Sequence, residues 1–163
     1  MKLIFLDIDG VLNNEDWYAS GEANKVYDET KDIKAFNFDP NNWKWVEKLI
    51  QETDAKIVIS SSWRSYSLES TIDDFVNTAF EPMIKHIIGV TPYSFERHRG
   101  GEIETFLNTT DLEIENYVII DDDTDMLTHQ LPHFVNVCYT NGMTENDYKK
   151  AKEILKDQIL LGE

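Results

Sequence analysis

The sequence has few basic residues, a single cysteine and no long apolar run, and each shortage excludes a class of protein. Lys and Arg together number 15 of the 163 residues, against 31 Asp and Glu, which gives a formal net charge of −16 at pH 7. A chain with this charge repels nucleic acids and anionic membranes, so any nucleic-acid site must be a local basic patch or use a metal ion. No stretch approaches the roughly 20 apolar residues of a membrane span.

The single cysteine, Cys138, has no partner for an intrachain disulfide. It lies in the apolar run 134–139, and we expect it to be a buried thiol on a strand. The apolar run at residues 3–6 ends at Asp7 and is too short for the core of a signal peptide. We therefore expect a reduced, soluble protein of the cytoplasm that has no membrane partner.

What the sequence does contain is enough apolar material for a core. Hydrophobic residues make up 41% of the chain and aromatic residues 12%, which excludes an intrinsically disordered chain. A length of 163 residues is too short for two ordinary domains. We expect one domain over residues 1–163.

Short apolar runs predict the strands of a sheet. The runs at 3–6, 57–59 and 117–120 are β-branched or aromatic, almost continuous, and followed by polar residues. Such runs are typical of strands buried on both faces of a parallel sheet. The run at 134–139 predicts a fourth strand.

Helical patterns separate these runs. Asp39 and Pro40 have the types expected of an N-cap and a first helical residue, and an apolar stripe at helical spacing follows them. In the terminal helix, Thr144 is the expected N-cap and Asp147 is placed to reach back to it. Further helical patterns cover 68–80, 84–88, 101–107 and 144–161. The alternation predicts an α/β fold with a mostly parallel, doubly wound sheet.

Residues 13–38 form the irregular part of the chain. They mix a polar stretch, a glycine turn at Gly21 and several lysines. An insertion of this length in a compact domain is usually functional, so we expect a lid or flap, with a plain surface loop as the alternative.

Polar groups follow three of the predicted strands, at 7–9, 60–62 and 121–123. In an open α/β sheet, ligands bind beyond the carboxyl ends of the strands. Alternation along the chain makes Asp7 and Asp9 point the same way. These carboxylates and those of the 121–123 group would repel one another without a cation. Hard oxygen ligands suit Mg²⁺ better than Zn²⁺.

These groups resemble the motifs of a known superfamily. The string Asp7-Ile8-Asp9-Gly10-Val11-Leu12 resembles the first motif of the haloacid dehalogenase-like (HAD) phosphohydrolases. Ser60 resembles the second motif, Arg99 the third, and the strand ending at Asp121-Asp122 the fourth. All four occur in order, so the resemblance covers most of the chain.

Wider strings are most similar to one phage and bacterial branch of that superfamily. They are Ser61-Ser62-Trp63-Arg64, Arg99-Gly100-Gly101-Glu102-Ile103 and Asp121-Asp122-Asp123. The branch is the HAD-like domain associated with RNA-repair proteins, and it is related to the 3′-phosphatase half of polynucleotide kinase-phosphatases.

The resemblance implies a Mg²⁺-dependent phosphatase with defined roles. Asp7 would be the nucleophile that forms an aspartyl-phosphate, and Asp9 would be the general acid and base. Ser60 would bind a phosphoryl oxygen, and Arg99 would offset the charge of the phosphoryl group. The implied metal site comprises Asp7, the backbone carbonyl of Asp9, Asp122 and, beside it, Asp121.

Two of these assignments stay open. Ser61 is an alternative to Ser60 as the phosphate ligand, and Arg97 is an alternative to Arg99. Of the four histidines, only His98, which lies between two arginines, is a candidate for a role in the site.

Near the fourth motif, Asp123 and Asp125 are expected to be helix N-caps rather than metal ligands.

The insertions leave no room for a large cap domain, and an open site admits a bulky substrate. The middle third, residues 56–110, is the least acidic, with five basic and seven acidic residues. It contains Arg64 and Arg97, which we expect to contact the substrate. We predict a phosphatase for a nucleic-acid 3′-phosphate or a nucleotide. The alternatives are a small-metabolite phosphatase and a non-catalytic phosphate- or partner-binding module on the same fold.

Overall fold

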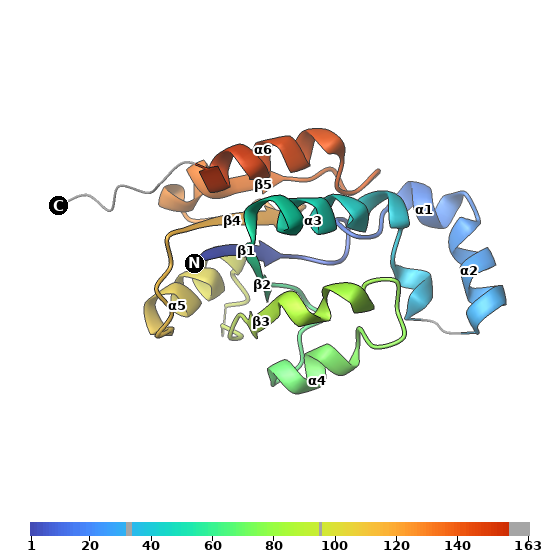
Figure 1. Cartoon of the computed structure of the whole chain (residues 1–163), viewed down its shortest axis with the longest axis horizontal. Coiled ribbons are helices and arrows are strands. Elements are labelled where there is room, and N and C mark those ends of the chain that lie inside the picture. Colours follow the sequence, from blue (N-terminus) through green and yellow to red (C-terminus); the bar gives the residue numbers. More distant parts are fainter. Residues whose placement is uncertain (32–33, 95, 157–163) are drawn as a thin grey trace.

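A computed structural model describes residues 1–31, 34–94 and 96–156 and has a five-stranded sheet at its centre (Figure 1). All neighbouring strands pair in parallel, in the order β3-β2-β1-β4-β5. The strands are β1 (Lys2–Leu6), β2 (Lys56–Ile59), β3 (Ile87–Val90), β4 (Asn116–Asp121) and β5 (Phe134–Asn136). The predicted α/β class with a doubly wound, parallel sheet is confirmed.

The described residues also form six α-helices and three 3₁₀ turns, of which α6 follows the last strand. The helices are α1 (Glu15–Ala19), α2 (Glu22–Thr30), α3 (Pro40–Thr53), α4 (Leu68–Asp73), α5 (Arg99–Thr109) and α6 (Glu145–Lys156). The turns are η1 (Ala35–Asn37), η2 (Glu81–His86) and η3 (Thr128–His133). Both predicted caps are confirmed. Asp39 accepts a hydrogen bond from the backbone N of Asn41 at 2.9 Å, and the Asp147 carboxylate accepts one from the backbone N of Thr144 at 2.9 Å.

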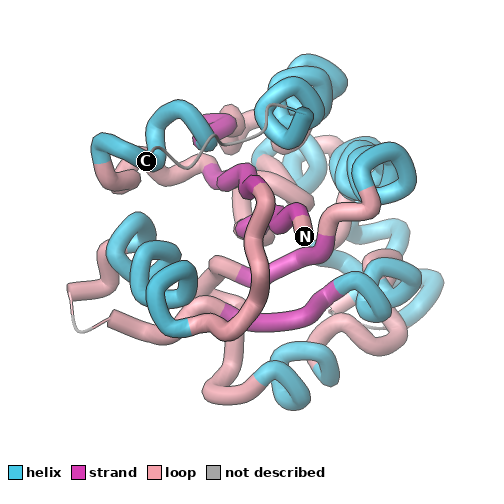
Figure 2. The backbone as a smooth tube through the Cα atoms, turned by 60° about the vertical axis from the view of Figure 1, so that its left-hand side comes forward, coloured by secondary structure: helices cyan, strands magenta, loops and turns pink. Residues whose placement is uncertain are grey.

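The helices cover both faces of the sheet, as Figures 1 and 2 show. Crossovers between parallel strands are right-handed, so the direction in which the chain moves along the sheet decides the face that each crossover covers. The chain moves outward from β1 to β3 and then returns past β1 to β4, which puts α3 and α5 on opposite faces. Alternate residues of β1 follow this division: Ile4 and Leu6 belong to the larger core under α3 and α6, and Phe5 packs with Ile103 of α5.

The prediction of a helix over 84–88 is confirmed for 84–86, which belong to the 3₁₀ helix η2, and was wrong for 87–88. These residues comprise the end of η2 and the start of β3, which pairs with β2 at one edge of the sheet. The strand is only four residues long and includes Gly89, where an added Cβ would lie 3.0 Å from the ring of Phe106. Such a short run has no clear period, and its pairing with β2 makes it a strand.

Two predicted helices differ in length from the observed ones. The helix expected over 68–80 ends at Asp73, and Asn77 has a left-handed φ of 64°, which a helix does not accommodate. The helix expected over 101–107 is α5, which begins at Arg99 and ends at Thr109. The last part of the predicted terminal helix, 157–161, lies outside the described residues.

The strand predicted over 134–139 is confirmed as β5 but is shorter than expected, and the prediction of a buried Cys138 was wrong. β5 ends at Asn136, and Cys138 is exposed. The chain turns at this point, because the backbone N atoms of Asn141 and Gly142 donate to the Cys138 carbonyl oxygen at 3.2 and 2.9 Å. The side chain that completes the core here is Val137.

The segment 13–38 is helical rather than irregular: it contains α1, α2 and η1. Its anchor is Trp17, a buried side chain whose Nε1 donates to the carbonyl oxygen of Phe36 at 2.9 Å. In Figure 1 these helices lie at one end of the molecule, beyond the carboxyl end of β1. A lid or flap function for this segment stays a prediction.

Candidate active site

Three carboxylates meet where the direction of the sheet reverses, between β1 and β4. Asp7 directly follows β1, Asp121 is the last residue of β4, and Asp122 follows it. One carboxylate oxygen from each of the three lies within 4.8 Å of the others. Such a switch point is the usual place for a ligand in this class of sheet. Gly10, with a φ of 75°, allows this approach, because an added Cβ would lie 2.4 Å from the Asp122 Oδ2 atom.

The three carboxylates are strongly perturbed by burial and by one another. Burial raises the pKa of Asp7, although Arg99 and a hydrogen bond from Ser61 oppose the rise. Burial and the nearby Asp7 carboxylate raise the pKa of Asp121 to about 8 and that of Asp122 to about 6. A divalent cation would stabilise the charged forms of the three carboxylates and so offset the effects of burial and mutual repulsion. The close group of hard oxygen donors fits Mg²⁺.

Arg99 supplies a positive charge beside the carboxylates. Its Nε lies 3.0 Å from Asp121 Oδ2, and its Nη2 lies 3.7 Å from Asp7 Oδ1. Arg99 is the first residue of α5, and its backbone N donates to Asp125 Oδ2 at 2.8 Å. His98 is the N-cap of the same helix, because its Nδ1 accepts from the backbone N of Gly101 at 3.1 Å. The structure therefore gives His98 a capping role.

The two candidate serines after β2 have different surroundings. Both are buried. Ser61 interacts with the Asp7 carboxylate, whereas the Oγ of Ser60 has no hydrogen-bond partner among the described residues. Ser61 is thus the serine already in contact with the predicted nucleophile, which supports it as the phosphate ligand. The Ser60 Oγ is a buried hydroxyl available to an incoming oxygen atom.

Asp9 lies in the same cavity as Asp7 but outside the cluster of three carboxylates. Its side chain is exposed and accepts a hydrogen bond from Asn13 Nδ2 at 3.0 Å. Tyr18 of α1 lines this cavity too, and burial together with the Asp9 charge raises the pKa of Tyr18 to about 12. Sequence reasoning missed Tyr18, because it has no fixed spacing from the motifs. The only signal was that it lies in the 13–38 segment, which was predicted to be functional.

Arg64, a predicted substrate contact, makes its strongest contacts within the protein. Its Nη2 lies 2.6 Å from Glu102 Oε2, and its Nη1 donates to the carbonyl oxygen of Ser61 at 2.7 Å. Its guanidinium carbon lies 4.0 Å from the centre of the Tyr93 ring. These contacts support a role for Arg64 in positioning its neighbours, and a direct contact with substrate stays a prediction. Sequence reasoning missed Glu102 and Tyr93.

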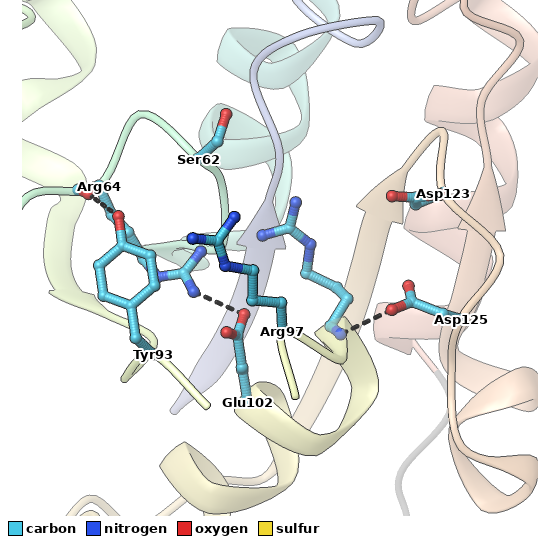
Figure 3. A pocket seen from close by; sticks show the side chains of 8 residues that line it. Ser62, Arg64, Tyr93, Arg97, Glu102, Asp123 and Asp125 are labelled. Carbon is cyan, nitrogen blue, oxygen red and sulfur yellow. Dashed lines mark hydrogen bonds and ion pairs between the residues drawn. The ribbon is translucent and has the colours of Figure 1, made fainter. Parts of the chain in front are cut away.

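Arg97 lies at the surface of a second cavity, next to the first. This arginine cavity has a volume of about 290 Å³ and is lined by Ser62, Arg64, Tyr93, Arg97, Arg99, Glu102, Asp123 and Asp125. Figure 3 shows the Arg97 side chain between the Tyr93 ring and the side chains of Asp123 and Asp125. Over residues 1–31, 34–94 and 96–156, Arg97 has no ion pair, unlike Arg64 and Arg99. Its charge is available to a ligand.

The neighbouring carboxylate cavity, of about 440 Å³, contains the predicted nucleophile. Its lining includes Asp7, Asp9, Asp122 and Tyr18, and it shares Ser62, Arg99 and Asp123 with the arginine cavity. The prediction that Asp123 and Asp125 are helix N-caps was wrong, because His98 is the N-cap of α5 and Leu127 that of η3. Asp125 instead accepts a hydrogen bond from the backbone N of Arg99 at 2.8 Å. Asp123 is exposed and lines both cavities.

Comparison with known proteins gives one match. Residues 3–148 match the model of a family described as the HAD domain in Swiss Army Knife RNA repair proteins. No curated protein and no solved structure matches the chain. Within its described residues, none of the helices has the length and apolar character needed to cross a membrane.

Proposed function

The chain belongs to the family of HAD domains in Swiss Army Knife RNA repair proteins, and on this basis we propose a Mg²⁺-dependent phosphomonoesterase that works through an aspartyl-phosphate. The observation that carries the proposal is the meeting of Asp7, Asp121 and Asp122 within 4.8 Å, beside the guanidinium of Arg99. The family supports a phosphohydrolase in general, and this cluster supplies the nucleophile and the charge balance that the reaction needs.

In the proposed reaction, a carboxylate oxygen of Asp7 attacks the phosphorus and the bond to the leaving oxygen breaks. Asp9 gives its proton to that leaving alkoxide. Asp9 then takes a proton from a water molecule, which attacks the phosphorus, releases phosphate and restores Asp7. The position of Asp9 at the exposed side of the cavity suits a group that exchanges protons with water and with the leaving group.

The remaining residues offset charge and orient the phosphoryl group. Arg99 stabilises the phosphoryl oxygens and the Asp7 carboxylate, and a serine hydroxyl, from Ser60 or Ser61, donates to one oxygen. Asp7, Asp122 and the Asp9 carbonyl would hold Mg²⁺. When bound, Mg²⁺ would offset the negative charge that gathers in this site.

The proposed substrate is a nucleic-acid 3′-phosphate. The arginine cavity adjoins the carboxylate cavity, with which it shares Ser62, Arg99 and Asp123, and Arg97 makes no ion pair with any described acidic group. A second phosphate, next to the scissile one, has the charge and position to bind there. A mononucleotide has no such phosphate.

The test compares Mg²⁺-dependent phosphate release from a 3′-phosphorylated oligonucleotide and from the matching nucleoside 3′-monophosphate. We expect a faster rate on the oligonucleotide. This advantage should shrink with added salt and with Arg97→Ala, because the contact is electrostatic. Lys85→Ala, which removes a cation outside both cavities, is the matched control. The salt dependence should be shallow, since a protein of net charge −16 engages few phosphates.

Two outcomes would overturn parts of this proposal. Equal rates on both substrates at low salt would reject the polynucleotide and leave a nucleotide or small-metabolite phosphatase. No phosphate release from nucleotides, oligonucleotides, sugar phosphates or phosphopeptides would reject the enzyme and leave a non-catalytic binding module.

A further inference from the structure

Two exposed tyrosine rings lie beside Arg97, at the end of the arginine cavity away from the carboxylates. The Tyr66 side chain is 100% exposed and that of Tyr93 is 52% exposed. Their ring centres are 6.3 Å apart, with an angle of 55° between the ring planes. Single exposed aromatic residues are common on protein surfaces. A pair of them next to Arg97, a cation that forms no ion pair with the described residues, is a feature that needs an explanation.

The tyrosine pair borders a third cavity, which adjoins the arginine cavity. This tyrosine cavity has a volume of about 690 Å³ and is lined by Arg64, Ser65, Tyr66, Tyr93, Ser94 and Arg97. It shares Arg64, Tyr93 and Arg97 with the arginine cavity, which in turn shares Arg99 with the carboxylate cavity. The three cavities are therefore neighbours, and their shared residues lead from Asp7, past Arg99 and Arg97, to the two tyrosines.

Tyr93 is held in place although half of it is exposed. Its hydroxyl donates to the Arg64 carbonyl oxygen at 2.5 Å, and its ring lies on the Arg64 guanidinium. The ion pair with Glu102 fixes that guanidinium, and Glu102 also accepts a hydrogen bond from the backbone N of Ser94 at 2.9 Å. Figure 3 shows these contacts joining Arg64, Tyr93 and Glu102. A ring fixed in this way loses little conformational entropy when a ligand stacks on it.

We propose that Tyr66 and Tyr93 are a platform for a nucleobase near the 3′ end of a single-stranded substrate, in which the base stacks on one ring and contacts the other, inclined at 55°, at its edge. Arg97 then binds the phosphate between that nucleotide and the scissile group. The inference rests on the proposed phosphatase function and specifies its substrate. A strand of nucleic acid alternates phosphates and flat bases, and the path from Asp7 presents cations first and aromatic rings beyond them. A phosphopeptide has no matching series of flat rings.

The platform selects for unpaired bases. A base can lie on a tyrosine ring only when its own face is free, so the end of the strand must be unstacked from a duplex. We expect a 3′-phosphorylated single strand to react faster than the same strand annealed to its complement with a blunt end. The nucleoside 3′-monophosphate should not benefit from the platform, because its base does not reach the tyrosine cavity.

The test is a double-mutant cycle in which one change removes the tyrosine ring from the protein and the other removes a base from the oligonucleotide. Tyr66 is the residue to change, because its fully exposed side chain contributes nothing to the core. We expect Tyr66→Ala to lower kcat/KM on the oligonucleotide about 10-fold and Tyr66→Phe to preserve it. Oligonucleotides lacking one base in turn at each of the terminal positions should show a similar loss at one position. With that oligonucleotide, Tyr66→Ala should cause no further loss.

Matched controls separate the platform from the chemistry. Tyr27→Ala removes a tyrosine that is 42% exposed and lies on α2 outside the three cavities, and it should leave all rates unchanged. Hydrolysis of p-nitrophenyl phosphate, which is too small to reach the platform, should be the same for Tyr66→Ala and the unmodified protein.

Each contrary result has a distinct meaning. Equal losses for Tyr66→Ala and Tyr66→Phe, or additive losses in the cycle, would overturn the platform and leave the phosphatase intact. A phosphopeptide that reacts faster than the oligonucleotide would overturn the choice of nucleic acid. If no phosphoester is hydrolysed, the proposed function fails, and fluorescence anisotropy with a labelled single strand then decides on the platform. Equal affinity of the unmodified protein and Tyr66→Ala would overturn it.

Discussion

The guanidinium of Arg64 and the carboxylate of Glu102 form an ion pair that is almost completely shielded from water. Their nearest atoms are 2.6 Å apart, and the two side chains are 2% and 4% exposed. The pair joins the loop after β2 to the first turn of α5, and it holds Tyr93 and Ser94 through their hydrogen bonds to Arg64 and Glu102.

Because this ion pair is buried, we expect the stability of the fold to be sensitive to a single substitution in it. Glu102→Gln leaves the buried Arg64 charge unpaired, and we expect it to lower the free energy of unfolding by about 3–5 kcal/mol. Glu22→Gln, which breaks the exposed ion pair with Lys25, should change it very little. Urea denaturation of both variants measures the difference. Similar small effects would show that the buried pair does not hold this part of the fold.

Asp7→Asn tests the nucleophile. The amide has the shape of the carboxylate but cannot attack phosphorus as an anion, so turnover should fall to background. The variant should fold, and without metal it should melt at a higher temperature, because a buried charge that raises the pKa of Asp121 and Asp122 is gone. Residual turnover above about a tenth of the unmodified rate would contradict the aspartyl-phosphate.

Mg²⁺ should stabilise the folded protein, because only the folded chain brings Asp7, Asp121 and Asp122 together. We expect the melting temperature to rise with millimolar Mg²⁺ and to fall again with a chelator. Asp122→Ala should remove this response and, by relieving repulsion, stabilise the metal-free protein. A melting temperature that ignores both Mg²⁺ and chelator would count against the metal site.

The stability of the metal-free protein should fall as pH rises through the range from about 4 to about 8. In the folded state the pKa of Asp121 is about 8 and that of Asp122 about 6, against 3.8 for an ordinary aspartate. Between these values the folded chain holds protons that the unfolded chain releases, so raising the pH favours unfolding. Asp121 and Asp122 therefore contribute most to the free energy of unfolding at the acid end of this pH range.

The pH prediction is measured by thermal melting in chelator at several pH values. Asp121→Asn removes the group with the larger shift, so its melting temperature should vary less with pH than that of the unmodified protein. The same slope in both proteins would show that Asp121 is ionised in the folded state without metal.

Local patterns in the sequence were sufficient to predict much of the sheet and the gathering of Asp7, Asp121 and Asp122 at one edge of it. The runs that form β1, β2 and β4 are buried on both faces, so their apolar character is continuous and visible without a structure. The caps at Asp39 and Thr144 act over two or three residues, and they too were predictable. Since parallel strands end at one edge of the sheet, the polar residues after them had to gather there.

Other features were decided by tertiary structure. β3 is a strand because it pairs with β2, and Cys138 is exposed because the chain turns after β5. Residues distant in sequence come together in the Arg64–Glu102 ion pair and in the contact between Tyr66 and Tyr93. Periodicity and capping operate within a few residues and leave a trace in the sequence. Contacts across crossovers depend on how helices pack on the sheet, and no spacing along the chain encodes them.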